Sequence, residues 1–233
     1  MGFDYTTLLV FPLGLLLPII TLVAFALLKN KKTVKFDTVF YGIGAFLGSI
    51  VVAFIIFIIM QTVLVSGFSA DNYASGYTLV SIIFSVLIAV IFVCCESFKM
   101  VTIKKYADKE EKAFAPSLGF SAGVVIAQSG VFFVALNIFK DATPLFALFT
   151  GAFILLSGVM YYVLSYAAEI SFTLGSKYAA YAVSAVYYVM WIFMMLFINS
   201  PTLIVVIAAL FFVISLVLGY AFVKRTKKSG SDR

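Results

Sequence analysis

The sequence contains no histidine, and charged residues make up only 11% of its 233 residues. Histidine is the usual zinc ligand and the usual acid or base near neutral pH, so its absence argues against a zinc enzyme. The two cysteines, Cys94 and Cys95, are adjacent and form neither a disulfide framework nor a Cys-x-x-Cys site. Cys94, Cys95 and Glu96 are consecutive, and the side chains of consecutive helical residues point about 100° apart, so the three cannot bind one ion. We therefore expect no metal site, no cofactor and no intact catalytic set.

Apolar side chains are present in excess. Hydrophobic residues make up 64% of the chain, including 26 phenylalanines and 13 tyrosines. A soluble domain is about half apolar and a quarter charged, and a globule of this length could not cover so much apolar surface. This composition excludes a soluble enzyme, a nucleic-acid-binding protein and a disordered chain. It predicts an integral membrane protein whose partner is, first of all, the lipid bilayer.

Seven stretches are long and apolar enough to cross a bilayer, which takes roughly 20 helical residues. They cover about residues 6–28, 39–65, 77–98, 118–139, 144–168, 178–198 and a last stretch that ends at Val223. Backbone groups in lipid must be bonded within their own segment, so the spans are expected to be helices. We predict an all-α fold with one seven-helix domain over residues 1–223. Residues 101–117 form the largest loop, read as a helical extension or an amphipathic segment, and residues 224–233 form a short basic tail, expected to be disordered.

The basic residues predict the orientation. If the N-terminus is outside, the cytoplasmic segments hold 15 of the 16 lysines and arginines, and only Lys140 is outside. The positive-inside rule then places the C-terminal tail in the cytoplasm. The net charge of +6 is explained by this orientation and requires no nucleic acid. The N-terminus lacks the basic start of a cleavable signal peptide, so we expect the first span to be retained, in what is most simply a bacterial plasma membrane.

Two acidic residues fall inside or at the end of predicted spans. Glu96 lies near the end of the third span and Glu169 at the end of the fifth. Ionisable residues within a membrane are expensive, and they are functional candidates by default. Lys99 follows Glu96 by three residues, so the two share one helix face and can pair. The alternative is an acid at the interface, neutralised by a lysine that extends towards the head groups.

Polar and small residues within the spans predict helix packing. Ser121, Gln128, Ser129 and Asn137 in the fourth span are expected to hydrogen-bond to neighbouring helices. Two Gly-x-x-x-Gly pairs, Gly44 with Gly48 and Gly119 with Gly123, predict close helix approach.

Aromatic residues gather in the sixth span: Tyr178, Tyr181, Tyr187, Tyr188 and Trp191. They are interpreted as interface and packing residues, since tyrosine and tryptophan are enriched at membrane interfaces. The alternative is that they line a ligand cavity.

The third and fourth spans carry a resemblance. The run Phe92-Val-Cys-Cys-Glu96-Ser-Phe-Lys99, followed by Leu118-Gly-Phe-Ser-Ala122-Gly123, resembles the YhfC-type intramembrane proteases. That family belongs with the CAAX-prenyl-protease-like superfamily, which includes the APH scaffold subunit of gamma-secretase. Its members carry two adjacent acids followed by an arginine, then Gly-x-Gly-His-Gly and a further acid. A proline in the first span (Pro12 or Pro18) and the run Tyr41–Phe46 also fit.

The departures from this pattern fall on the groups that the family uses to activate water and hold the peptide carbonyl. The first acid is replaced by Cys95, the arginine by Lys99, the histidine by Ala122 and the further acid by Ile126. Glu96 is kept. The resemblance therefore implies a degenerate member without protease activity, in which Glu96 with Lys99 is the best remaining catalytic candidate.

The preferred hypothesis is a scaffold or regulator that binds a membrane protein or peptide. The predicted binding groove lies between the third and fourth spans and is lined by Cys95, Glu96, Lys99, Ser121, Ala122, Gly123 and Gln128. Small residues on one wall would leave room for a guest helix or an extended peptide. The alternatives are the membrane subunit of a small-molecule transporter and a residual protease that uses Glu96.

Overall fold

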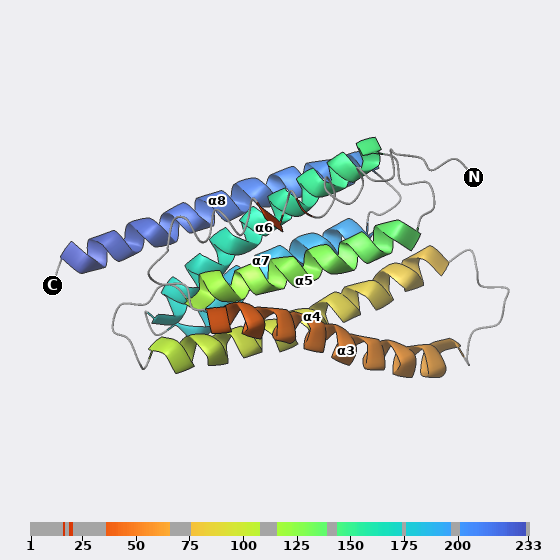
Figure 1. Ribbon diagram of the computed structural model, residues 1–233, viewed down its shortest axis with the longest axis horizontal. Helices are drawn as coiled ribbons and strands as arrows, with labels where there is room; N and C mark the ends of the chain where they lie inside the picture. The colour runs from red at the N-terminus through yellow and green to blue at the C-terminus, as the bar shows by residue number, and fades with distance from the viewer. Residues whose placement is uncertain are drawn as a thin grey trace.

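The computed structural model describes residue 16 and residues 19–20, 36–65, 76–107, 116–138, 144–173, 176–196 and 201–231. Most of these residues lie in six long helices, drawn in Figure 1. The helices are α3 (Phe36–Val65), α4 (Gly76–Ala107), α5 (Pro116–Ile138), α6 (Pro144–Thr173), α7 (Lys177–Leu196) and α8 (Pro201–Ser231). The predicted all-α class is confirmed for this part of the chain.

The helices coincide with the second to seventh predicted spans. Within the described residues, four helices contain segments long and apolar enough to cross a membrane: Asp37–Met60, Ile82–Lys105, Gly151–Phe172 and Val205–Phe222. The apolar stretch of α5, Leu118–Val131, is shorter. The first predicted span, about residues 6–28, lies almost wholly outside the described residues. These apolar helices are compatible with an integral membrane protein.

Helix starts follow local sequence rules. Proline occupies the first position of α5, α6 and α8, where its fixed φ suits a helix and its missing N–H breaks no hydrogen bond. The carbonyl of Ser176 accepts a hydrogen bond from the Ala180 N–H (3.1 Å) and so starts α7. Successive helices run in opposite directions. The starts of α3, α5 and α7 therefore lie at the same end of the bundle as the ends of α4, α6 and α8 (Figure 1).

Two helices extend beyond the predicted spans. Helix α4 continues to Ala107, so the first part of the predicted loop 101–117 is helical, as one of its two interpretations anticipates. Helix α8 continues to Ser231, and the expectation of a disordered tail from Lys224 is wrong for the tail residues that the structure describes. Lysine and arginine have high helix propensity and are favourable near a helix C-terminus, so the helix has no local reason to end at Val223.

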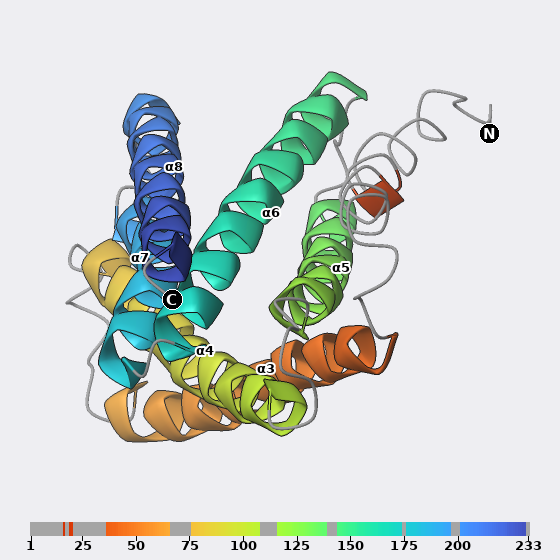
Figure 2. The ribbon, with the colours of Figure 1, turned by 90° about the vertical axis from the view of Figure 1, so that its left-hand side faces the viewer.

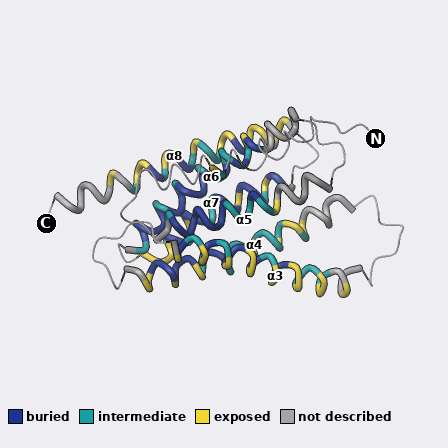
Figure 3. The backbone as a smooth tube through the Cα atoms, viewed as in Figure 1, coloured by how far each residue is buried: buried dark blue, intermediate teal, exposed yellow. Residues whose placement is uncertain are grey.

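Helix α6 has the most deeply buried of the four apolar segments. In its apolar segment 61% of the residues are buried, against 22% in α3, 22% in α4 and 17% in α8. Figure 3 shows the buried residues gathered where α4, α5, α6 and α7 meet, with exposed residues along α3 and α8. Viewed along the bundle, α3 and α4 cross on one side while α6 and α8 diverge on the other (Figure 2). The exposed apolar surface of α3 and α8 is what a lipid environment would cover.

Helices α3 and α5 cross closely at Gly42 and Gly123. A Cβ at Gly123 would collide with the Val39 carbonyl oxygen, and one at Gly42 with the Phe120 carbonyl oxygen. Close approach at Gly123 is therefore confirmed. At Gly44 and Gly48 the described residues show no such approach, because none of their atoms lies within 4 Å of a Cβ at either position.

A buried charge pair as the candidate functional site

Glu96 and Lys99 lie in the interior of the bundle. Both side chains have a relative exposure of 0%, and the Lys99 ammonium forms an ion pair with Glu96 Oε2. Three residues apart on α4, they lie on one helix face, and the predicted pair is confirmed. The alternative, in which Lys99 extends to the head groups, is wrong because no part of its side chain is exposed.

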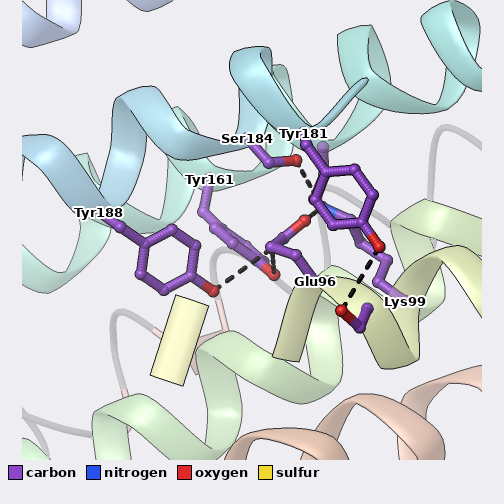
Figure 4. A network of polar contacts seen from close by, with 8 residues as sticks. Glu96, Lys99, Tyr161, Tyr181, Ser184 and Tyr188 are labelled. Carbon is purple, nitrogen blue, oxygen red and sulfur yellow. Dashed lines mark hydrogen bonds and ion pairs between the residues drawn. The ribbon is translucent and has the colours of Figure 1, made fainter. Parts of the chain in front are cut away.

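The Glu96 carboxylate accepts hydrogen bonds from two other helices (Figure 4). The hydroxyl of Tyr161 on α6 donates to Oε1 at 2.9 Å, and that of Tyr188 on α7 donates to the same oxygen at 3.3 Å. Both tyrosines are buried. Oε1 therefore accepts hydrogen bonds from two hydroxyls, and Oε2 forms the ion pair with Lys99.

The Lys99 ammonium is bound in the same way. Its Nζ donates to Ser165 Oγ on α6 (3.1 Å) and to Ser184 Oγ on α7 (3.0 Å), and it lies 5.4 Å from the centre of the Tyr161 ring. An ammonium has three N–H donors. Ser165 and Ser184 accept from two of these donors, and the ion pair with Glu96 neutralises the charge.

This arrangement joins three helices through one pair of charges. Each charge sits on α4 and is bonded by one residue from α6 and one from α7. Two isolated charges would be very costly in an apolar interior, and a pair is tolerable only with good geometry and further hydrogen bonds. The network therefore makes one relative rotation of α4, α6 and α7 much more favourable than others.

An aromatic cluster surrounds the pair. Tyr187 packs against Tyr161 and Tyr188, with ring centres 5.0 and 5.4 Å apart, and Phe92 lies 5.1 Å from Tyr188. The rings of Trp191 and Tyr187 also pack together, with centres 6.4 Å apart. Of the aromatic residues predicted in this helix, Tyr187, Tyr188 and Trp191 are thus interior packing residues, whereas Tyr178 is 91% exposed, as an interface residue would be.

Gln128 joins the cluster from α5. Its Oε1 accepts a hydrogen bond from the Tyr187 hydroxyl at 2.8 Å, so its predicted bond to a neighbouring helix is confirmed. Ser129 differs, because its hydroxyl donates to the Val125 carbonyl of its own helix at 2.7 Å. Ser49 and Ser171 bond to their own helices in the same way, a common solution in apolar surroundings. The Asn137 side chain lies outside the described residues.

Most of the residues predicted to line the groove are buried between the described helices. Cys95, Ser121 and Ala122 are buried, as are Glu96 and Lys99. Gly123, which was expected to leave room for a guest, instead contacts the α3 backbone at Val39 and Ile43. At Gly123 the glycine face of α5 is therefore covered by α3. Glu169, the other acidic candidate, is buried on α6 and not exposed at an interface.

Three residues at the site were not predicted from the sequence: Tyr161, Ser165 and Ser184. Tyr188 was predicted as an interface or packing residue, and not as a partner of Glu96. A signal was present. Tyr161, Ser165 and Glu169 repeat every four residues on α6, and Tyr181, Ser184 and Tyr188 repeat at three and four residues on α7. Such spacing places each set on one helix face. In Figure 4 the α7 set lies along the pair, and Tyr181 donates to Ser97 Oγ of α4 at 3.4 Å.

The chemistry of the site is inferred from its own geometry, because comparison with family models, curated proteins and solved structures gave no match. Among the described residues there is no group of three or more histidine, cysteine, aspartate or glutamate residues that could hold a metal ion. The residues that do meet form a neutralised pair of charges. Such a pair orders helices well, but in this arrangement neither group is open to a substrate.

Proposed function

We propose that this chain is a non-catalytic membrane scaffold or regulator with an intramembrane-protease-like architecture, which binds a membrane protein or a peptide. One observation carries the proposal: the carboxylate that the sequence motif retains is 0% exposed and bonded by Lys99, Tyr161 and Tyr188. A general base must reach the water or the proton that it moves. Glu96 is instead held as part of the packing between helices.

The proposed topology has seven spans, with the N-terminus outside and the C-terminus in the cytoplasm of a bacterial cell. It is supported by exposed lysines at one end of the bundle: Lys104 and Lys105 end α4, Lys177 begins α7 and Lys224 lies late in α8. Fusion of fluorescent protein or alkaline phosphatase after Arg233 tests the orientation. We expect fluorescence and no phosphatase activity, and the reverse result would overturn it.

The outer face of α3 is the surface that we assign to the partner. It carries large exposed apolar residues, including Val51 at 58%, beside the open positions Gly44 and Gly48. A transmembrane helix of a partner could approach closely there, because glycine leaves the backbone uncovered. The face of α8 serves as a control, since Val217 is equally exposed at 61% but has no such glycine pair beside it.

Photo-crosslinking in intact cells tests the partner. A photoreactive phenylalanine analogue at Val51 is expected to yield a discrete adduct of higher mass, and the same analogue at Val217 is not. If the adduct from Val51 disappears in the Gly48→Leu variant, the partner binds at this face of α3. Equal labelling from both positions, or none from either, would contradict the assignment.

A residual protease is tested separately. The purified chain should not cleave transmembrane peptides above the level of its Glu96→Gln variant. Cleavage that Glu96→Gln abolishes would overturn the scaffold proposal, whatever the crosslinking shows.

A transporter subunit is the second candidate, and one observation favours it. Tyr187, Tyr188 and Trp191 line the bundle interior beside the charge pair, where a small ligand would sit. The rings pack against one another, so a ligand would have to separate them. Mass spectrometry of the gently purified protein would support transport only if a small molecule is retained and Tyr188→Ala releases it.

A further inference from the structure

The end of the bundle where α4 finishes and α3 begins carries a second polar site. Lys105 Nζ donates a hydrogen bond to the Tyr41 hydroxyl at 3.1 Å and lies 5.1 Å from the centre of the Tyr41 ring. The edge of Phe98 meets the same ring, with centres 6.4 Å apart. A lysine that is exposed to solvent is thus held in one place by an aromatic residue of the neighbouring helix.

The residues beside Lys105 change from apolar to basic along one helix face. Phe98, Val101 and Lys105 are spaced by three and four residues, so they line up on α4. Phe98 is 46% exposed and Val101 is 66% exposed, and Phe40 on α3 is 68% exposed. An apolar strip that ends in a fixed ammonium matches the shape of a phospholipid, with acyl chains below a phosphate.

We propose that Tyr41, Phe98, Val101 and Lys105 form a binding site for an anionic phospholipid in the inner leaflet. The Lys105 ammonium pairs with the phosphate, and the Tyr41 hydroxyl, which accepts from Lys105, uses its own hydrogen to donate to a phosphate oxygen. Basic sites between membrane helices on the cytoplasmic side bind anionic head groups by this chemistry. The acyl chains lie on Phe98 and Val101. The inference rests on the proposed membrane orientation.

Two substitutions of opposite effect on the charge of the site test the proposal. Asp37 is exposed in the first turn of α3, one turn before Tyr41, and its negative charge opposes a phosphate. Lys105→Gln should therefore weaken the preference for anionic lipid, and Asp37→Asn should strengthen it. Lys177→Gln is the matched control, because Lys177 is an exposed lysine at the same end of the bundle.

The chain is reconstituted in vesicles of phosphatidylcholine with a minor fraction of phosphatidylglycerol, extracted gently, and analysed by native mass spectrometry. The full chain should retain phosphatidylglycerol in preference to phosphatidylcholine. Lys105→Gln should reduce that preference about fivefold, Tyr41→Phe by less, and Asp37→Asn should raise it. Lys177→Gln should leave it unchanged.

Two results would overturn the site. One is an unchanged preference in Lys105→Gln, and the other is an equal loss in Lys177→Gln, which would indicate attraction by diffuse charge. Membrane insertion is assayed separately by extraction with alkaline carbonate. A chain that stays in the membrane without lipid preference refutes the lipid site alone, whereas a chain that is extracted refutes the membrane placement itself.

Discussion

Replacing Lys99 by methionine should be among the most destabilising single changes in this protein. Methionine keeps most of the length of the lysine side chain but removes the ammonium. The Glu96 carboxylate would then remain buried with hydrogen bonds from Tyr161 and Tyr188 but without a counter-charge. Removing one partner of a buried ion pair typically costs about 3–5 kcal/mol. Full burial of both side chains places Lys99→Met within that range, because solvent cannot compensate the lost charge.

The companion changes separate charge from packing. Glu96→Gln leaves the Lys99 ammonium unneutralised, so it should cost a similar amount. The double variant removes both charges, and its glutamine oxygen can still accept hydrogen bonds from the tyrosines. Because replacement of a whole buried pair is often neutral or stabilising, the double variant should be clearly more stable than either single variant. This recovery distinguishes a charge effect from a simple loss of side-chain contacts.

The assay can use a probe already present beside the pair. Trp191 is the single tryptophan of the chain, it is buried, and it contacts Tyr187 and Phe153. Its fluorescence should report separation of α7 from α4 and α6 during titration with a denaturing detergent in mixed micelles. If Lys99→Met unfolds at the wild-type midpoint, the pair does not hold the helices together. If the double variant loses as much as both single variants together, the two residues act independently and the network is misinterpreted.

The remaining predictions use neighbouring residues as controls for each other. Tyr161→Phe should lose about 1.5–3 kcal/mol, as expected for a hydrogen bond to a charged group. Tyr162→Phe should be nearly neutral, because the buried Tyr162 hydroxyl has no hydrogen-bond partner among the described residues. The same detergent titration measures both, and equal losses would contradict the assigned bond. Gly123→Ala should cost about 1–3 kcal/mol, because its methyl group would collide with the α3 backbone, while Gly44→Ala should cost nothing. A stable Gly123→Ala protein would contradict the close crossing of α3 and α5.

The sequence predicts those features that depend on a single helix. The pairing of Glu96 with Lys99 depends only on a spacing of three residues, and helix starts at Pro116, Pro144 and Pro201 depend only on proline geometry. Helical spans follow from apolar length in the same way. These features need no knowledge of which helix packs against which, and so they could be predicted.

Features that involve two helices are harder, and the glycines show why. Gly42, Gly44 and Gly48 all lie on α3, yet among the described residues only Gly42 meets the backbone of another helix. In a soluble helix the polar face would identify the outward side. Both sides of α3 are apolar, so composition cannot indicate which glycine faces inward. The same ambiguity explains why Gly123 was expected to border an open groove.

The buried charges resolve that ambiguity for the helices that they touch. In an apolar bundle, rotating a helix exchanges one apolar contact for another at little cost. Rotating α6 would remove Tyr161 from Glu96 and Ser165 from Lys99 together, and rotating α7 would remove Tyr188 and Ser184. Each rotation leaves charged groups unsatisfied where water cannot reach them, which is far more costly than lost apolar contact. Glu96 therefore has a role that needs no catalysis: together with Lys99 it specifies how α4, α6 and α7 face one another.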